Sequence, residues 1–249
     1  MSEQQELTVE AYRRRSRRSF VTGGVAALAG VAGWRSLQGA DPDFRIPGPL
    51  RAVHETNEAI WSTLMRDDHL ATEYPISEAS VLRVNGLHGI RDDIDLDTWE
   101  ITVLGPDGEQ LGTHALDDIK ALPWHEMTIE HKCIEGWSQV TNWQGARFSD
   151  FFALYQDRLP DDITHVFLQT PDGEYYVSVD MATMRHPQTL LAYDNFGEAI
   201  SDRNGAPLRL ATPLKYGIKQ IKRIGSIQFR RDQGADYWGE RGYDWYAGL

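Results

Sequence analysis

The sequence HVFLQTPDGEYYVSV, at residues 165–179, combines two β-like runs with a turn between them. His165–Gln169 and Glu174–Val179 are rich in β-branched and aromatic side chains, which favour extended strands. Pro171-Asp172-Gly173 supplies the backbone angles that a tight turn requires, because proline fixes φ and glycine tolerates positive φ. The stretch therefore predicts two strands joined as a hairpin.

Outward from this hairpin, strand-like runs and turns continue in both directions. Further strands are expected at Val81–Val84, Trp99–Leu104, Met127–Cys133 and Ile224–Arg230, with turns at Asn85-Gly86, residues 105–108 and Asn204-Gly205. Helices are expected at Ala52–Met65, Leu116–Leu122 and Phe148–Arg158. Hairpin-like pairs with scattered helices predict an α+β fold with mixed sheets and peripheral helices, and no GxGxxG or Walker pattern indicates a nucleotide fold.

The composition is that of an acidic folded protein. Of 249 residues, 41% are hydrophobic and eight are tryptophan, which suffices for the buried core of one domain. A net charge of −12 repels phosphate backbones, so nucleic acid is not expected as a partner. The single cysteine, Cys133, excludes an internal disulfide, and on its own it is more simply a small buried side chain than a reactive thiol.

The first 40 residues predict an export signal. Ser16-Arg17-Arg18-Ser19-Phe20-Val21 is a twin-arginine pattern, and the run from Phe20 to Trp34 carries no charge. This run is shorter than the ~20 residues of a comfortable membrane span, which favours a signal over a transmembrane helix. Residues 1–40 are thus expected to direct the chain to the periplasm or cell-envelope exterior, or to remain as an anchor, with a linker at residues 41–52. The alternative is a basic tail beside a short core helix.

Residues 203–231 contain no acidic side chain, although the chain as a whole is acidic. The block holds eight cations: Arg203, Arg209, Lys215, Lys219, Lys222, Arg223, Arg230 and Arg231. Such a concentration predicts a bound phosphate, with Lys215, Lys219 and Lys222 at helical spacing and Gly205 and Gly217 allowing close backbone approach. A solvated basic face is the alternative, but the apolar residues of the block, such as Ile218 and Ile221, favour a buried segment.

Four blocks, taken in order, carry a family resemblance: CIEGWS at residues 133–138, HPQTL at 186–190, NGAPLRL at 204–210 and KYGIKQIK at 215–222. Over roughly Val53–Arg231 the chain resembles the sulfite-oxidase superfamily of molybdopterin-dependent oxidoreductases, and within it the catalytic subunits of periplasmic methionine sulfoxide reductases. The resemblance implies a sulfite-oxidase-type fold in which residues 53–249 form a catalytic domain. It also implies molybdopterin and molybdenum as cofactors.

The same resemblance implies a set of site residues. Cys133 matches the thiolate that binds the metal, a role that suits a soft sulfur donor. Glu135 matches a catalytic carboxylate near the metal. The implied cofactor contacts are Asn57, Ile60, Trp61, Cys133, Thr170, Asn204, Arg209, Gln220, Ile221 and Lys222.

The expected activity is oxygen-atom transfer, in the direction of reducing a sulfoxide-like small molecule. No haem-attachment motif is present, so electrons are expected from a membrane haem or quinone-linked protein, and the catalytic subunit is expected to be monomeric. Sulfite oxidation is an alternative that Glu135 disfavours, because a carboxylate repels an anionic substrate. A non-catalytic exported binding domain is another, in which the C-terminal aromatics Tyr237, Trp238, Tyr243, Trp245 and Tyr246 form a docking patch instead of packing.

Overall fold

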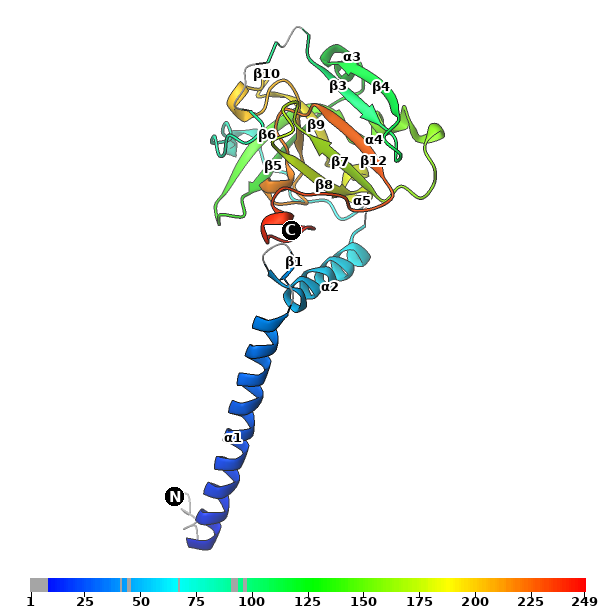
Figure 1. The fold of residues 1–249 in the computed structure, drawn as a ribbon. Helices are drawn as coiled ribbons and strands as arrows, with labels where there is room; N and C mark the ends of the chain where they lie inside the picture. Colours follow the sequence, from blue (N-terminus) through cyan, green and yellow to red (C-terminus); the bar gives the residue numbers. More distant parts are fainter. Residues whose placement is uncertain (1–8, 41, 44–45, 67, 91–93, 96–97) are drawn as a thin grey trace. The chain divides into compact units, whose positions relative to one another are not determined.

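The computed structural model describes residues 9–40, 42–43, 46–66, 68–90, 94–95 and 98–249 (Figure 1). The chain divides into two compact units, residues 1–53 and residues 54–249. In the first unit, helix α1 (Val9–Gly39) is followed by the two short strands β1 (Pro42–Asp43) and β2 (Ile46–Pro47). Tyr12–Gly39 is long and apolar enough to cross a membrane, a property that signal sequences near an N-terminus share. Helix α2 (Gly48–Leu64) confirms the helix expected from residue 52 onward.

One sheet of the second unit is antiparallel and has the strand order β10-β9-β6-β5, with β11 also pairing with β9. Its strands are β5 (Trp124–Lys132), β6 (Ser138–Arg147), β9 (Leu190–Asn195), β10 (Glu198–Ala199) and β11 (Arg209–Ala211). The long β5–β6 hairpin turns at residues 133–137, where the Cys133 amide donates to the Trp137 carbonyl at 2.9 Å. The only cysteine therefore sits at the tip of a well-anchored hairpin.

The other sheet is mixed and has the order β4-β3-β12-β7-β8, with β12 parallel to β3 and antiparallel to β7. Its strands are β3 (Glu100–Leu104), β4 (Gln110–Ala115), β7 (His165–Gln169), β8 (Tyr176–Asp180) and β12 (Ser226–Arg230). The predicted hairpin is confirmed as β7–β8, with His165 opposite Asp180 and Gln169 opposite Tyr176.

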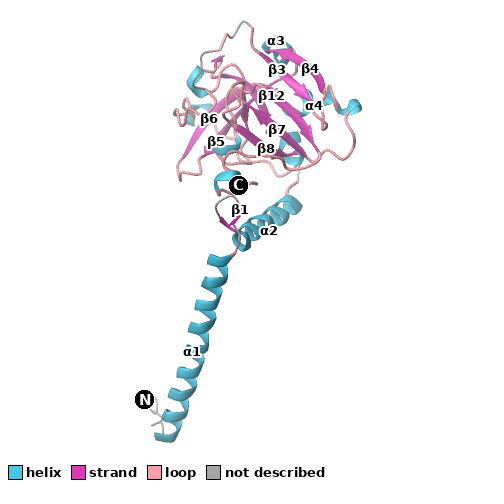
Figure 2. Ribbon diagram, viewed as in Figure 1, coloured by secondary structure: helices cyan, strands magenta, loops and turns pink. Residues whose placement is uncertain are grey.

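Helices in this unit are short and peripheral (Figure 2): α3 (Leu116–Lys120), α4 (Phe148–Ala153) and α5 (Met181–Arg185). The 3₁₀ turns are η1 (Ile76–Glu78), η2 (Gln156–Arg158), η3 (Asp202–Asn204), η4 (Gly217–Lys219) and η5 (Gly239–Arg241). The arrangement confirms the α+β class with mixed sheets.

Two local expectations were wrong. Residues 81–84 form no strand, because the Arg83 amide is satisfied by the side chain of Gln139 at 3.1 Å instead of by a neighbouring strand. The helix expected through Arg158 ends at Ala153 and gives way to the turn η2. At residues 81–84 a side-chain contact thus overrides the local pattern.

The hydrophobic core draws on both sheets. Ile101 and Val103 of β3 pack in one cluster with Leu191 of β9 and with Phe148 and Phe151 of α4, all fully buried or nearly so. Burial of side chains of this size contributes roughly 1.5–3 kcal/mol each. The core thus fixes the two sheets against each other, and the loops at their ends are held in place to form the site.

Candidate functional site

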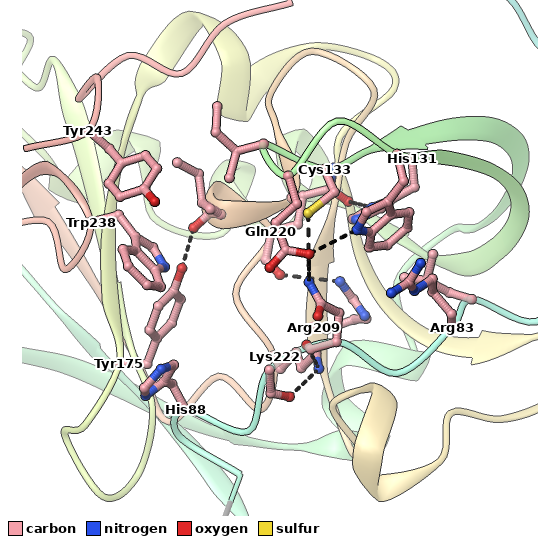
Figure 3. A pocket seen from close by; sticks show the side chains of 18 residues that line it. Arg83, His88, His131, Cys133, Tyr175, Arg209, Gln220, Lys222, Trp238 and Tyr243 are labelled. Carbon is pink, nitrogen blue, oxygen red and sulfur yellow. Dashed lines mark hydrogen bonds between the residues drawn. The ribbon is translucent and has the colours of Figure 1, made fainter. Parts of the chain in front are cut away.

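A cavity of about 290 Å³ opens among four loops of the second unit (Figure 3). The walls come from residues 82–88, from residues 131–137 around the β5–β6 turn, from residues 217–222, and from the C-terminal residues Trp238 and Tyr243. Arg209 and Tyr175 complete it. Segments distant in sequence therefore meet at one place, and part of the acid-free block lines it.

Cys133 lies at this cavity and is 8% exposed. The Asn85 side-chain amide is 3.7 Å from the Cys133 sulfur, and the same nitrogen donates to Oε2 of Glu135 at 3.3 Å. The Trp137 indole donates to that carboxylate oxygen at 3.1 Å. Two donors thus fix the Glu135 carboxylate next to the thiol. From the sequence, Asn85 was expected only as part of a turn with Gly86, so this bridging role was missed.

Arg209 is the most deeply buried cation at the cavity, at 1% exposed. Its guanidinium donates to the backbone carbonyls of Asn204 at 2.7 Å, Gln220 at 3.2 Å and Leu210 at 3.4 Å, and it stacks 4.5 Å from the ring centroid of Trp143. Burial lowers the pKa of Arg209 to about 9. In the described part of the chain no carboxylate pairs with this guanidinium, so its charge is uncompensated.

Lys222 is the second uncompensated cation. Its ammonium donates to three backbone carbonyls, those of Asn85 at 2.7 Å, Arg203 at 3.0 Å and Gly86 at 3.1 Å. Burial, and secondarily repulsion from Arg209, lower the pKa of Lys222 to about 8. Two positive charges that repel each other and lack an acid among the described residues form a site that favours an anion.

His131 stands at the same wall, and its Nδ1 is 3.2 Å from Oε1 of Gln220. Burial, together with the charges of Arg209 and Lys222, lowers the pKa of His131 to about 4, so the imidazole is neutral at physiological pH. Gln220 is fixed in turn, because its side-chain amide donates to the Lys215 carbonyl at 3.0 Å. The cavity wall is therefore a connected polar network.

The two glycines expected to approach a ligand also make close protein contacts, and Gly217 lines the cavity. A Cβ on Gly217 would lie 2.7 Å from Nε2 of His131, and a Cβ on Gly205 would lie 2.7 Å from Cβ of Lys222. Gly205 also has φ of +108°, which side chains rarely tolerate. These glycines let the loop carrying Lys222 pack tightly.

Opposite the cations, the cavity has an aromatic wall (Figure 3). His88 and Tyr175 are stacked at 6.3 Å, and Trp238 packs edge-on to Tyr243 at 5.1 Å. The Tyr175 hydroxyl donates to the Ile218 carbonyl at 2.5 Å and so joins this wall to the cation-bearing loop. Trp238 and Tyr243 were expected to pack or to dock a partner. A dense run of C-terminal aromatics was the only sequence feature that pointed to them.

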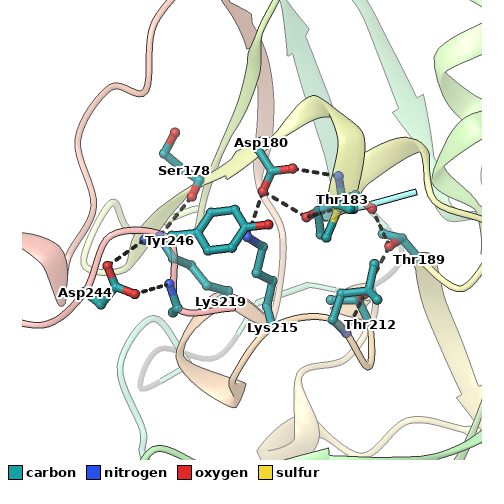
Figure 4. Close-up of polar contacts among 12 residues, drawn as sticks. Ser178, Asp180, Thr183, Thr189, Thr212, Lys215, Lys219, Asp244 and Tyr246 are labelled. Atoms are coloured by element: carbon teal, nitrogen blue, oxygen red, sulfur yellow. Dashed lines mark hydrogen bonds and ion pairs between the residues drawn. The ribbon is translucent and has the colours of Figure 1, made fainter. Parts of the chain in front are cut away.

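Lys215 and Lys219 do not share a helical face with Lys222, contrary to the spacing argument, because their segment forms only the 3₁₀ turn η4 (Figure 4). The Lys215 ammonium is 2.8 Å from Asp180 and lies over the ring of Tyr246. The Lys219 ammonium forms an ion pair with Asp236 and donates to a backbone carbonyl. Both lysines are 1% exposed and acid-paired, away from the cavity lining.

The implied site residues fall into three groups. Cys133, Glu135, Arg209, Gln220 and Lys222 line the cavity. Thr170, Asn204 and Ile221 are buried beside it: Thr170 bonds Asp172, Asn204 donates to the Leu82 carbonyl, and Ile221 accepts from the Leu210 amide. Asn57, Ile60 and Trp61 lie exposed on α2 and do not line the cavity, so their contact with a cofactor stays a prediction.

Taken together, the site offers one soft thiol, a fixed carboxylate, and two cations without acids in the described structure, the buried Arg209 and the half-buried Lys222. The donor set fits a group that is anionic at one end and carries a thiolate-binding metal at the other. Asn204 also has a buried side-chain oxygen without a partner in the described structure, which a ligand donor could satisfy. These features define a site for an anionic metal cofactor.

Comparison with known proteins identifies the family. The family model described as the oxidoreductase molybdopterin-binding domain matches residues 88–238. This range contains the cavity residues from His88 to Trp238. The chain therefore belongs to this family and is a molybdopterin-dependent oxidoreductase with a sulfite-oxidase-type fold.

Several curated proteins are similar over most of the chain. A protein named as the methionine-sulfoxide reductase subunit YedZ1 of Azospira oryzae is 30% identical, and the match covers 97% of this chain and 89% of that protein. The protein-methionine-sulfoxide reductase catalytic subunit MsrP of Campylobacter jejuni is 30% identical over 76% of this chain and 68% of its own length. The MsrP of Ralstonia nicotianae is 31% identical, with 56% and 46% covered.

Among solved structures, the sulfane dehydrogenase SoxCD of Paracoccus pantotrophus is similar with a TM-score of 0.50. Its sequence is 16% identical, and the match covers 57% of this chain and 40% of that chain. At this identity the likeness concerns the fold alone, and it agrees with the mixed sheets described above.

Proposed function

We propose that this chain is an exported molybdenum-dependent reductase of sulfoxides of the methionine sulfoxide type, supplied with electrons by a membrane partner. The observation that carries the proposal is the Cys133–Asn85–Glu135 contact beside two cations that lack acids. The names of the relatives, which describe methionine-sulfoxide reductase subunits, support the substrate class.

Each wall of the cavity has a separate task in this proposal. Arg209 and Lys222 would hold the anionic part of molybdopterin, and Cys133 would bind the metal. The bound molybdenum cofactor supplies a two-electron redox centre able to exchange an oxygen atom with a substrate. The neutral His131 and the amide of Gln220 would orient the organic part without adding charge.

Reduction of a sulfoxide to a sulfide and water consumes two electrons and two protons. Glu135 is the carboxyl group at the cavity that could hold or release a proton at its other oxygen, Oε1, because Oε2 already accepts from Asn85 and Trp137. The aromatic wall of Trp238 and Tyr243 provides an apolar face for a methyl-sulfur group, since sulfur–aromatic contacts contribute ~0.3–1.5 kcal/mol. An anionic substrate such as sulfite would meet the Glu135 carboxylate.

The twin-arginine pattern and the apolar helix α1 support export, with α1 as a signal or a retained anchor. The reduced state must then be regenerated outside the cytoplasm, which supports a membrane haem or quinone-linked protein as the electron donor. We expect the chain to act as the catalytic subunit beside that donor.

The test is a cofactor and turnover analysis of the natively exported protein. We expect about one molybdenum and one molybdopterin per chain, together with oxidation of a reduced dye by methionine sulfoxide. Cys133→Ser should abolish turnover while retaining most of the pterin, because Arg209 and Lys222 remain. Dye reduction by sulfite without sulfoxide turnover would contradict the direction, and a folded protein without metal and pterin would contradict the function.

A further inference from the structure

Helix α2 turns polar residues toward the protein and leaves apolar residues exposed. Its polar residues His54 and Glu58 face the body of the second unit: His54 lies 3.5 Å from Asp244, and Glu58 lines a small pocket with Lys215. Burial raises the pKa of Glu58, consistent with this inward position. An amphipathic helix on a soluble domain normally turns its apolar side inward, so this helix is reversed.

Beside this inward side, α2 carries an exposed apolar stripe. Val53 is 55% exposed, Ile60, two turns later, is 50% exposed, and Leu64 is 56% exposed, with the uncharged Asn57 between them. Trp61, also 56% exposed, lies between this stripe and His54. Single exposed apolar residues are ordinary, but a continuous stripe on one helix indicates a surface that is covered in use.

The chain that precedes α2 indicates what covers it. Helix α1 contains a stretch long and apolar enough to cross a membrane, and eight residues separate the end of α1 from the start of α2. Eight residues span at most about 29 Å when fully extended. If α1 is retained in a bilayer, α2 must start close to the bilayer surface, where a half-exposed tryptophan is a favoured residue.

We infer that the outward face of α2, formed by Val53, Ile60 and Leu64 with Trp61 at its edge, lies on the surface of the lipid bilayer and fixes the catalytic unit there. This rests on the proposed export with α1 retained. It gives Ile60 and Trp61 a role other than the cofactor contacts implied by the family resemblance.

The chemistry of this face specifies the type of lipid contact. The face carries no Lys or Arg, and the protein as a whole has a net charge of −12. Attraction to anionic headgroups therefore cannot hold it, and burial of apolar side chains in the interface must. Binding is thus expected in neutral phosphatidylcholine and to be insensitive to salt.

The test uses the full chain in phosphatidylcholine vesicles, with spin labels on single introduced cysteines in a Cys133→Ser background. Ile60→Cys and Leu64→Cys report the outward face, Glu55→Cys is the matched exposed control on the same helix, and Leu28→Cys reports α1. Accessibility to oxygen and to a water-soluble nickel complex measures the depth of each label. We expect the labels at 60 and 64 to lose most nickel accessibility in vesicles at low and high salt, while the label at 55 keeps it.

Three results would overturn the inference: labels at 60 and 64 that stay in water, whether or not the label at 28 is in the bilayer; spin–spin broadening at 60, which would indicate a second copy; or loss of bound molybdopterin on labelling at 60, which would indicate a cofactor contact. Molybdenum content and sulfoxide turnover of the wild-type chain in the same vesicles are measured separately. The proposed function can therefore fail while the membrane contact holds, or the reverse.

Discussion

Two groups of cations from one acid-free stretch of sequence have different partners in the fold. Lys215 and Lys219 each find a carboxylate, Asp180 and Asp236 respectively, supplied by other parts of the chain. Arg209 and Lys222 find only backbone carbonyls in the described structure, and they face the cavity. The first pair is neutralised by the protein and holds the loop in place. The second pair remains available to bind an anion. A high local density of cations therefore does not by itself indicate a binding site, whereas cations without a paired acid do.

The largest expected effect concerns the acid-paired group. Asp236→Asn removes the charge that compensates Lys219, which is 1% exposed, and leaves a buried ammonium unpaired. Breaking such a pair costs about 3–5 kcal/mol. We expect a loss of this size in the unfolding free energy of the cofactor-free protein, measured by denaturant titration. Asp232→Asn, at an exposed ion pair with Arg230, is the matched control and should change stability by less than about 1 kcal/mol. Equal effects of the two substitutions would break the distinction.

The secondary structure and the fold class could be predicted well from the sequence because they depend on local patterns of residues. The β7–β8 hairpin follows from two β-rich runs around Pro171-Asp172-Gly173, and the α+β class follows from repeats of that arrangement. The segment at residues 81–84 could not be predicted, since its amide pairs with the distant side chain of Gln139. Tertiary contacts of this kind leave no trace in a single run of residues.

The site was predicted in part for the same reason. Cys133, Glu135, Arg209, Gln220 and Lys222 belong to recognisable blocks, and the cavity contains all five. Asn85 was missed because a contact with a sulfur 48 positions away has no local signature. The partners of Lys215 and Lys219 lie outside the acid-free block, so counting charges within it overstated the cations available to a ligand.

The second expected effect concerns the uncompensated group. Lys222→Met removes one cation from the cavity without leaving a buried acid unpaired, so the cofactor-free protein should lose less stability than Asp236→Asn does, although three backbone carbonyls lose their donor. A hydrogen bond to a charged group contributes about 1.5–3 kcal/mol, which corresponds to roughly 10- to 150-fold weaker retention of molybdopterin. Pterin release measured during dialysis checks this value. Lys132→Met, whose ammonium pairs with Glu130 outside the cavity lining, should release pterin at the wild-type rate. If the Lys222→Met protein were destabilised but retained pterin normally, Lys222 would belong with Lys215 and Lys219, the lysines that hold the loop in place.

The smallest expected effect is a pH dependence of anion binding. It distinguishes Lys222 from Lys215, although both lysines titrate in the same pH range. The pKa of Lys222 is lowered to about 8 by burial and by Arg209, and that of Lys215 is lowered to about 8 by burial despite Asp180. A phosphate monoester is fully ionised above about pH 7, since its second pKa is about 6. As pH rises through 8, Lys222 loses the proton that an anion requires, so the affinity of cofactor-free protein for phenyl phosphate should fall, approaching tenfold per pH unit.

Two variants test which lysine causes this fall in affinity. Lys215 loses its proton over the same range but faces Asp180, so Lys215→Gln should keep the slope of affinity against pH. Lys222→Met should remove the slope until Arg209, with a pKa of about 9, begins to titrate. Calorimetric titration of the three proteins between pH 7 and 9 measures these slopes, and a slope that disappears in Lys215→Gln but persists in Lys222→Met would reverse the assignment of the two groups.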